Sequence, residues 1–383
     1  MMASSYDVIV VGGGPAGGTA AYELAREGAR TLVLERERLP RYKACAGGLP
    51  LKTLRLLGLD LSSTCETEIT KGKCTFRGDY PVEMDFGKVV GWTVMRDKFD
   101  HLILRAAATA GARVLDCQTV TEVRTRSDRA IVRTSGEEFS CSIVIGADGA
   151  NSVIARSAGL MKKRRLAVAL ESEIRAPEEI IDEWRGCVQF DLGSAPRGYG
   201  WIFPKREFLS VGVATVLARP QDLKAHLLRL LEQVGIRQSS DEIKMRGHLV
   251  PLGGVDRVLH RERVLVAGDA AGVAEPMTGE GIYYAIRSAK LAARVISRAL
   301  EEGSVDLSPY TAQVNAQITR DLKYARLLAH MLYRLPRLTY HFFVRSPVVQ
   351  WGIADVLYGT STFQRLFFEL LKKGPTILAA GLR

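Results

Sequence analysis

The sequence predicts an α/β fold whose parallel sheet is assembled from separate stretches of chain, with an antiparallel insertion between the last two. Continuous apolar runs at 6–11, 143–147 and 263–267 are typical of strands buried on both faces of a parallel sheet. The first run leads into three consecutive glycines, and the other two end at Asp148-Gly149 and Gly268-Asp269. This arrangement predicts a discontinuous, Rossmann-like nucleotide-binding domain with a second domain inserted into it.

The first elements have the pattern of a βαβ unit. The strand at 6–11 is followed by a glycine turn and by a helix over about 15–28, which is rich in small residues and stops at Gly28. A second strand is predicted at 31–35. A helix near 97–110 ends at Gly111, and residues 113–145 predict a meander of short strands.

The insertion is predicted to be antiparallel, with strands near 166–175, 186–192, 198–204 and 209–216 and one helix near 220–235. A long helix with one apolar face follows at about 281–302. From Ser308 onward the chain is predicted to be helical, with interruptions at Pro336, Pro347 and Gly359.

These elements predict three regions. The nucleotide-binding domain comprises residues 1–64, 95–165 and 255–305, and a substrate-binding antiparallel-sheet domain comprises 65–94 and 166–254. Residues 306–383 form a C-terminal helical region that is both basic and apolar.

Composition excludes several classes of protein. With 383 residues, 47% hydrophobic and 25% charged, the chain has enough apolar material for a large core, unlike a disordered or collagen-like chain. The six cysteines are scattered without a CxxC pair, so we expect reduced thiols, a cytoplasmic location and no metal site. No apolar run is long enough for a spanning helix.

The formal net charge of +11 is unevenly distributed. Residues 320–383 carry ten Lys and Arg against three acids, which places +7 in the last sixth of the chain. Because these basic residues are interleaved with aliphatic and aromatic ones, they favour peripheral contact with an anionic membrane over a nucleic-acid partner. The alternative is that these helices simply cap the substrate domain.

The glycine turn has the spacing of a phosphate-binding loop. Gly12 permits a tight turn, Gly14 lets a pyrophosphate approach the backbone, and Gly17 allows the helix to pack on the strand. Glu35 ends the second strand eighteen residues after Gly17, where a carboxylate accepts hydrogen bonds from ribose hydroxyls. The first 36 residues therefore predict a dinucleotide site.

Together with GADG at 146–149 and AGDAAG at 267–272, this motif resembles the FAD fingerprints of the p-hydroxybenzoate-hydroxylase-like flavoproteins. Local sequences across residues 6–300 further resemble the geranylgeranyl reductase family; they are KACAGG at 43–48, RDKFD at 96–100, YGWIFPK at 199–205 and GEGI at 279–282. The resemblance implies FAD as cofactor, with Asp269 on its ribityl or ribose-side hydroxyls.

The cofactor residues expected from the motifs and from the resemblance are Gly12, Gly14, Ala16, Gly17, Glu35, Arg36, Cys45, Ala46, Gly48, Arg96, Val120, Asp148, Asp269, Gly281 and Ile282. Ala46 stands where the family often has a third glycine. Cys45, Trp201 and Lys205 are the catalytic candidates, with Cys45 as a proton donor or as a steric and electrostatic element beside the flavin. Lys43 would lower the pKa of this thiol if the two side chains meet. His248 shows no pairing or ligand spacing in the sequence and is expected to be a surface or core residue.

Tyr199, Trp201, Phe203 and Pro204 are predicted to form an apolar wall that grips a hydrophobic chain, although such alternation also occurs in ordinary sheet cores. The leading hypothesis is an FAD-dependent reductase of C=C bonds in a polyprenyl lipid, quinone or pigment precursor. An FAD monooxygenase of an apolar or aromatic compound is the alternative, and a prenyl-binding module without catalysis is a third. The electron donor is either NAD(P)H or a ferredoxin, because there is no second glycine-rich strand–helix unit.

Overall fold

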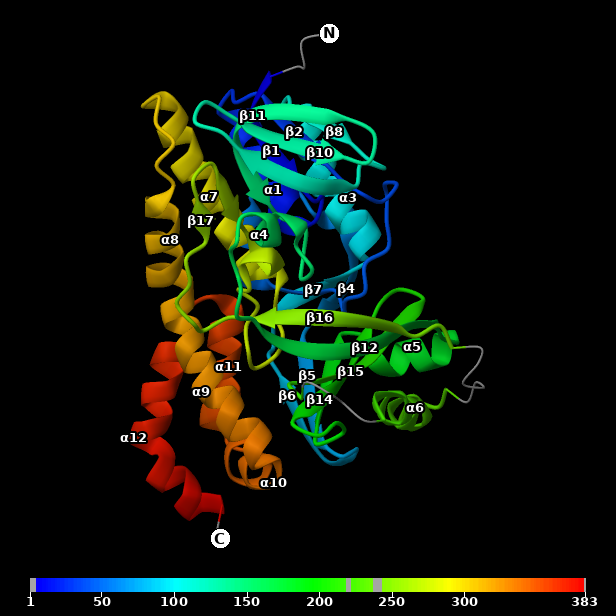
Figure 1. Ribbon diagram of the computed structural model, residues 1–383. Coiled ribbons are helices and arrows are strands. Elements are labelled where there is room, and N and C mark those ends of the chain that lie inside the picture. The colour runs from blue at the N-terminus through cyan, green and yellow to red at the C-terminus, as the bar shows by residue number, and fades with distance from the viewer. Residues whose placement is uncertain (1–4, 218–221, 237–242, 382–383) are drawn as a thin grey trace. The chain divides into compact units, whose positions relative to one another are not determined.

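The computed structural model describes residues 5–217, 222–236 and 243–381 (Figure 1). The chain forms two compact units, each built from three segments. Unit 1 comprises Met1–Tyr42, Asp97–Arg165 and Val250–Lys323, and unit 2 comprises Lys43–Arg96, Leu166–Leu249 and Tyr324–Arg383. This division rests on contacts within the chain and does not identify which unit binds the nucleotide or the substrate. The nucleotide-binding, substrate-binding and C-terminal regions therefore stay predictions.

Unit 1 contains the predicted parallel sheet, which confirms the α/β fold class. Its strand order is β17-β18-β11-β1-β2-β8, with β9 and β10 attached beside β11. Neighbouring strands from β18 to β8 run parallel, so the three apolar runs of the sequence lie side by side. The strands are β1 (Ser5–Val11), β2 (Thr31–Leu34), β8 (Arg113–Leu115), β9 (Val120–Thr125), β10 (Ala130–Thr134), β11 (Glu138–Gly146), β17 (His260–Arg261) and β18 (Val264–Val266).

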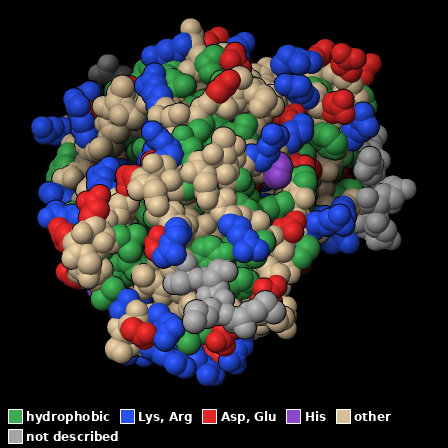
Figure 2. All heavy atoms as spheres, turned by 90° about the horizontal axis from the view of Figure 1, so that it is seen from above, with side chains coloured by type: hydrophobic (Ala, Val, Ile, Leu, Met, Phe, Trp, Pro, Cys, Tyr) green, Lys and Arg blue, Asp and Glu red, His purple; other side chains and the backbone are tan. Residues whose placement is uncertain are grey.

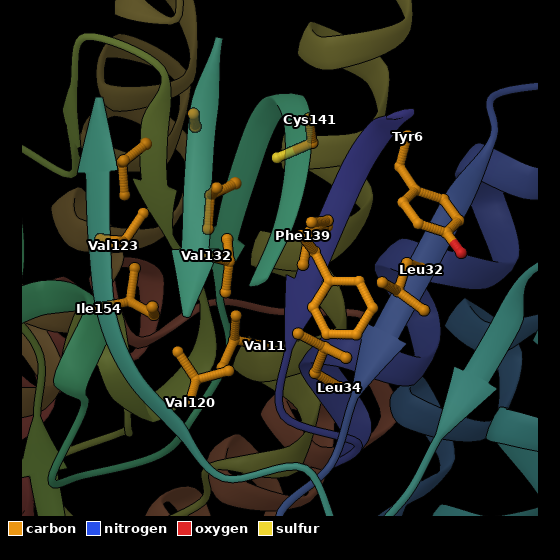
Figure 3. Close-up of a cluster of buried hydrophobic side chains, with 14 residues drawn as sticks. Tyr6, Val11, Leu32, Leu34, Val120, Val123, Val132, Phe139, Cys141 and Ile154 are labelled. Carbon is orange, nitrogen blue, oxygen red and sulfur yellow. The ribbon is translucent and has the colours of Figure 1, made fainter. Parts of the chain in front are cut away.

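The helices of unit 1 pack around this sheet. α1 (Pro15–Arg26) and α7 (Ile282–Glu301) contact each other and are joined by an ion pair between Glu23 and Lys290. Apolar side chains of β1, β2, β9, β10 and β11 form a core with Ile154 (Figure 3). The other helical elements are α3 (Arg96–Thr109), α4 (Val153–Ser157), the 3₁₀ turn η2 (Gly268–Ala271), α8 (Ser308–Val314) and the π-helical turn η3 (Asn315–Thr319).

Unit 2 contains a seven-stranded sheet of order β16-β12-β15-β14-β13-β5-β6 and a small sheet of order β3-β7-β4. The insertion is antiparallel, as predicted, except that β5 and β13 run parallel. No hairpin constrains this pair, because the two strands come from separate segments of the chain. The strands are β3 (Gly48–Pro50), β4 (Cys65–Ile69), β5 (Lys71–Phe76), β6 (Asp79–Asp85), β7 (Gly91–Val94), β12 (Arg165–Arg175), β13 (Cys187–Leu192), β14 (Gly198–Pro204), β15 (Phe208–Thr215) and β16 (Arg246–Leu252).

The two faces of the seven-stranded sheet differ. One face packs against α5 (Glu178–Trp184) and α6 (Leu223–Gln233) through a core that includes Ile202, Val211 and Leu227. The opposite face carries Phe190, Tyr199, Trp201 and Phe203, because residues that are two apart or directly opposite in the register point to the same side. We call these four residues the aromatic face.

The C-terminal region is helical, as predicted. New helices begin at Pro336 and Pro347, and Gly359 has the positive φ of a helix cap. Its elements are α9 (Arg320–Arg334), α10 (Pro336–Thr339), the π-helical turn η4 (Tyr340–Val344), α11 (Pro347–Tyr358) and α12 (Phe363–Gly381). Two further helical elements of unit 2 lie earlier in the chain: α2 (Leu51–Leu57) and the 3₁₀ turn η1 (Ser62–Thr64).

Two surface properties of the described residues bear on possible partners. None of the helices within them combines the length and hydropathy that a membrane-spanning segment needs. Figure 2 shows one face of the molecule, on which Asp and Glu side chains interrupt the Lys and Arg side chains.

Candidate active site

The glycine loop at the end of β1 is conformationally restricted to glycine at two positions. Gly12 has a φ of +103°, and a Cβ there would lie 2.4 Å from the carbonyl oxygen of Ala147. A Cβ on Gly17 would lie 1.8 Å from the carbonyl oxygen of Gly12. The first and third glycines thus have the roles predicted for them, the tight turn and the close packing of α1 on the strand.

The N-terminus of α1 is suited to an anion. Gly14 caps the helix without a side-chain hydrogen bond, and Pro15 follows in the first turn, so the first amides are not used by a cap. The nearest atom to a Cβ on Gly14 would be Nη2 of Arg41 at 3.6 Å, which leaves room beside the backbone. Such a helix end stabilises a pyrophosphate through its amide groups and its dipole. Ala16 is buried in the same turn.

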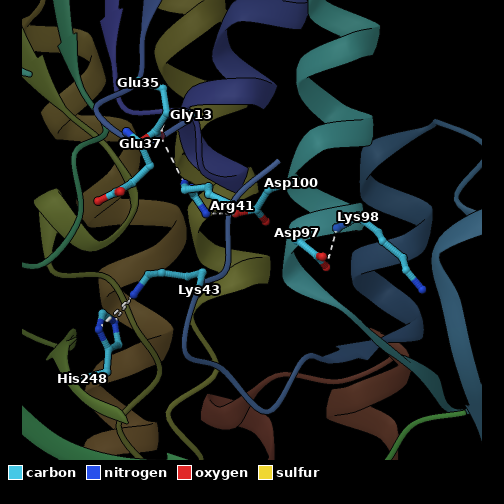
Figure 4. Close-up of polar contacts among 9 residues, drawn as sticks. All are labelled: Gly13, Glu35, Glu37, Arg41, Lys43, Asp97, Lys98, Asp100 and His248. Atoms are coloured by element: carbon cyan, nitrogen blue, oxygen red, sulfur yellow. Dashed lines mark hydrogen bonds and ion pairs between the residues drawn. The ribbon is translucent and has the colours of Figure 1, made fainter. Parts of the chain in front are cut away.

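Glu35 is 4% exposed and binds the glycine loop directly (Figure 4). Its Oε2 accepts a hydrogen bond of 2.7 Å from the amide of Gly13, and its Oε1 accepts one of 3.0 Å from the amide of Glu37. Each carboxylate oxygen has a second acceptor position. Glu35 therefore orders the loop, and its hydrogen bonds to ribose hydroxyls stay a prediction.

Arg41 is a residue of this site that sequence reasoning missed. Its guanidinium bridges two buried carboxylates, with Nε 3.3 Å from Oε2 of Glu35 and Nη1 3.1 Å from Oδ2 of Asp100 (Figure 4). The side chain of Arg36, a predicted cofactor residue, is 69% exposed and pairs with Glu37. The only signal in the sequence was the position of Asp100 in the RDKFD motif, since Arg41 itself follows no spacing rule.

Asp148 and Asp269 follow β11 and β18, at the same sheet edge as the glycine loop. Asp148 caps α4: its Oδ2 accepts from the amide of Val153 at 2.7 Å and its Oδ1 from the hydroxyl of Ser152 at 2.5 Å. Burial raises the pKa of this carboxyl group. Asp269 lies in η2, half-buried, with its Oδ1 3.5 Å from where a Cβ of Gly281 would stand. Asp269 stays a predicted ligand of a cofactor hydroxyl, and the side chain of Asp148 caps α4.

Two other predicted cofactor residues are buried. The side chain of Val120 lies in the hydrophobic core with Phe139, so only its main chain could reach a cofactor (Figure 3). Ile282 is the first residue of α7 and is 7% exposed. The carboxyl edge of the parallel strands is where α/β sheets bind dinucleotides, and the glycine loop, Glu35 and Asp269 all lie there. Unit 1 therefore fits the pyrophosphate and ribose part of FAD.

The Cys45 loop belongs to unit 2. The amide of Cys45 donates to Oε1 of Glu171 at 2.7 Å, and the amide of Gly47 donates to the Cys45 sulfur at 3.4 Å. A Cβ on Gly48 would lie 2.7 Å from the ring of Phe203, so this loop contacts the aromatic face. Ala46 is half-buried in the loop, and Arg96 is buried at the start of α3.

Lys43 and Lys205 have partners that the sequence did not indicate. Nζ of Lys43 lies 2.8 Å from Nε2 of His248 (Figure 4). The sequence did not predict this contact between Lys43 and His248. The Lys205 side chain is 0% exposed, and its Nζ binds the carboxylate of Glu173. A buried ammonium requires such a partner, and this ion pair ties Lys205 into the sheet.

The aromatic face is a continuous wall. The ring centroid of Phe190 lies 5.6 Å from that of Tyr199 and 5.5 Å from that of Phe203. The indole of Trp201 covers Gly212, where a Cβ would be 2.1 Å from an atom of the indole. Tyr333 of α9 stacks on Tyr199 at 6.3 Å. Within unit 2, the C-terminal helices therefore contact the face that was predicted to bind an apolar chain. Pro204 ends β14, and its carbonyl accepts from the hydroxyl of Thr93 at 2.7 Å.

Tyr340 secures the C-terminal helices to the far strands of the same sheet. Its hydroxyl donates to the carbonyl of Cys74 at 2.9 Å and also contacts the carbonyl of Tyr80. Its ring lies 5.8 Å from Phe76. Because Tyr340 is fully buried, this segment of the C-terminal region is an integral part of unit 2.

Residues 5–319 match the family described as FAD binding domain. A digeranylgeranylglycerophospholipid reductase from Methanocaldococcus jannaschii is 32% identical over 86% of this chain and 86% of its own length. A geranylgeranyl diphosphate reductase from Rhodobacter capsulatus is 34% identical over 78% of this chain and 76% of its own. The chain belongs to the geranylgeranyl reductase family.

A solved structure supports the same assignment. A geranylgeranyl bacteriochlorophyll reductase-like protein from Thermoplasma acidophilum is 25% identical, with a TM-score of 0.79 over 96% of this chain and 99% of that one. As a member of the geranylgeranyl reductase family, the chain is an FAD-dependent oxidoreductase. This confirms the predicted enzyme class and cofactor, and it removes the hypothesis of a binding module without catalysis.

Proposed function

We propose that this enzyme saturates C=C bonds of a polyprenyl chain, of the geranylgeranyl type, carried on a lipid, a quinone or a pigment precursor. The observation that carries the proposal is the aromatic face of unit 2, against which the C-terminal helices pack. An isolated alkene has no carbonyl for the protein to polarise, so the protein must supply proximity and a dry, apolar environment. A wall of four aromatic side chains supplies both, and the relatives named above are prenyl-chain reductases.

Separate groups of residues would bind the cofactor, hold the proton and orient the prenyl chain. The glycine loop, Glu35 and Asp269 hold the cofactor, and when bound and reduced, FAD supplies the hydride to one alkene carbon. Cys45 holds the proton for the other carbon, so each step adds two hydrogen atoms. Trp201, with Tyr199, Phe203 and Pro204, orients the chain. Lys205 and Glu173 fix the end of the aromatic face. NAD(P)H or a ferredoxin then restores the reduced cofactor.

An anaerobic turnover tests the reaction. The protein is reduced with dithionite and incubated with geranylgeranyl lipids or prenyl quinones, and the product masses are measured. We expect a gain of two hydrogens per step, and at least a hundredfold slower gain in Cys45→Ala, the lower end of the range of roughly 10²–10⁴ that a positioned proton donor contributes. An unchanged rate in the variant would remove Cys45 as proton donor. Products one oxygen heavier, formed only with oxygen and NAD(P)H, would instead establish a monooxygenase.

We also propose that the enzyme is cytoplasmic and meets its substrate at a membrane surface. Helices α9 and α10 expose the apolar side chains of Leu327, Met331, Leu335 and Leu338. Arg334 and Arg337 are exposed among them, and no acidic residue between 327 and 338 interrupts the stretch. Apolar side chains with neighbouring cations are typical of helices that lie in the interface of an anionic bilayer.

Vesicle sedimentation tests this surface. Binding is compared for vesicles of phosphatidylcholine alone and for vesicles that also contain phosphatidylglycerol. We expect binding to the anionic vesicles only, and at least tenfold weaker binding when Leu327→Glu and Met331→Glu are combined, because both apolar contacts are lost. Val258→Glu, at an exposed valine of unit 1, is the matched control. Equal binding of the double variant and the control would contradict the proposal.

A further inference from the structure

Glu171 is a buried carboxylate of unit 2 for which the proposed chemistry assigns no role. It is 3% exposed and lies on β12. In the sheet register Glu171 is opposite Gly212, and Gly212 is opposite Trp201, so Glu171 shares a face with the indole. Because Gly212 has no side chain, the indole occupies the space in front of that strand. Glu171 therefore borders the aromatic face.

This carboxylate is a hydrogen-bond acceptor for the main chain of Cys45. The bond from the Cys45 amide is 2.7 Å long and joins residues 126 positions apart. A charged, buried acceptor makes a stronger hydrogen bond than a neutral one, particularly where water does not compete. Glu171 thus restrains the loop at the residue that carries the thiol.

Two further contacts restrain the same loop. The carbonyl of Gly47 accepts from the amide of Val94 at 2.9 Å, and a Cβ on Gly47 would lie 2.2 Å from the carbonyl of Val94. The ring of Phe203 leaves no space for a side chain on Gly48. Both contacts lie on the C-terminal side of Cys45. Cys45 itself has two contacts: the Gly47 amide donates to its sulfur at 3.4 Å, and Glu171 accepts from its amide at 2.7 Å, so Glu171 fixes the main chain that carries the thiol.

We propose that Glu171 is a positioning residue that holds the Cys45 thiol against the aromatic face for proton delivery. The delivery of a proton rests on the proposed function, whereas the positioning stands on the contacts of unit 2. A group that transfers a proton has to stand within hydrogen-bond reach of the acceptor. Releasing the loop would therefore slow reduction without removing the thiol.

The first test measures the alkylation of individual cysteines by N-ethylmaleimide, read by mass spectrometry in the purified protein. We expect Cys45 to be alkylated about tenfold faster in Glu171→Ala, a factor that corresponds to the loss of one hydrogen bond to a charged acceptor. Glu171→Gln retains an amide oxygen as acceptor and is expected to stay within about twofold of the original rate. Exposed Cys117 is the internal reference, and Glu207→Ala, at an exposed carboxylate of the same unit, is the control.

The same measurement reports whether unit 2 remains folded. Burial raises the pKa of Cys74 to about 12, so we expect this half-buried thiol to react slowly while the sheet is intact and faster when it opens. If Cys74 reacts faster in Glu171→Ala, Glu171→Met, which keeps most of the side-chain volume without an acceptor, replaces it. The proposal is overturned if Cys45 alkylation is unchanged without an acceptor at position 171, or if Glu171→Gln behaves like Glu171→Ala.

Turnover then separates the inference from the proposed function. We expect Glu171→Ala to slow the gain of two hydrogens about tenfold and Glu171→Gln to retain most of the rate. If alkylation responds as expected but no variant or parent protein reduces a prenyl chain, the proposed function fails and the positioning of Cys45 stands. If the parent protein reduces the chain and neither variant differs from it, the role of Glu171 in the reaction is wrong.

Discussion

At the scale of single residues, one carboxylate connects the parts of the cofactor site in unit 1. Glu35 accepts hydrogen bonds from two backbone amides and lies 3.3 Å from Nε of Arg41. A buried carboxylate with three such contacts orders the surrounding backbone more than it contributes net stability. The site is therefore sensitive to this residue before any contact with ribose is considered.

We expect Glu35→Ala to weaken FAD binding by at least tenfold, because the glycine loop loses its acceptor and Arg41 loses a partner. The measurement is a fluorescence titration of the flavin-free protein with FAD. Glu37→Ala is the control, since the Glu37 carboxylate is 57% exposed. An unchanged affinity in a folded Glu35→Ala protein would show that the loop holds FAD without this carboxylate.

Sequence reasoning succeeded at residues whose requirement is local and failed where a partner is distant. Gly12 and Gly17 could be assigned because backbone geometry alone demands glycine. Arg41 was missed, since nothing in the spacing shows that it turns toward Asp100. In the same way, the sequence did not indicate that the side chain of Asp148 caps α4.

At the scale of elements, the turn that precedes α7 is organised by another buried acid. Glu275 accepts hydrogen bonds from the amide of Thr278 at 2.8 Å and from its hydroxyl at 2.7 Å. Burial disfavours the charged form and raises the pKa of Glu275 to about 7. The turn leads to Gly281, which lies beside Asp269, so its geometry bears on the cofactor site.

The raised pKa gives a prediction for the dependence of stability on pH. Between pH 4.5, the ordinary pKa of the glutamate side chain, and pH 7, the folded state binds the proton more tightly than the unfolded chain does. The free energy of unfolding therefore falls as pH rises through this range, by on the order of 3 kcal/mol from this group. We expect Glu275→Gln to lack this component, as measured by urea unfolding at pH 5 and pH 8. An identical pH dependence in both proteins would contradict the assignment.

At the scale of the whole molecule, the expected cofactor residues are divided between the two compact units, whereas the aromatic face lies in unit 2 alone. Unit 1 holds the glycine loop, Glu35 and Asp269, and unit 2 holds Cys45 and the aromatic face. A ligand that binds only the folded state stabilises it in proportion to the logarithm of its concentration. FAD should therefore stabilise the chain through unit 1.

We expect FAD at about 100 times its Kd to stabilise the flavin-free protein by about 2.7 kcal/mol, with a corresponding rise in Tm. Hydrogen exchange should slow at the start of α1, where the first amides are not used by a cap and are expected to bind the pyrophosphate. The measurements are calorimetry and exchange mass spectrometry with and without FAD. A Tm that does not respond to FAD would show that the dinucleotide cradle of unit 1 does not bind it.

Residue types alone were sufficient for the parallel sheet, the glycine loop, the helical C-terminal region and the common face of the aromatic residues. Each of these depends on a short-range rule: backbone conformation, side-chain alternation along a strand, or interruption by proline and glycine. The contacts that complete the candidate sites needed the folded chain. They join Arg41 to Asp100, Cys45 to Glu171 and Lys43 to His248 across 59, 126 and 205 positions. Spacing in a sequence carries no information over such separations, because only packing brings those backbones together.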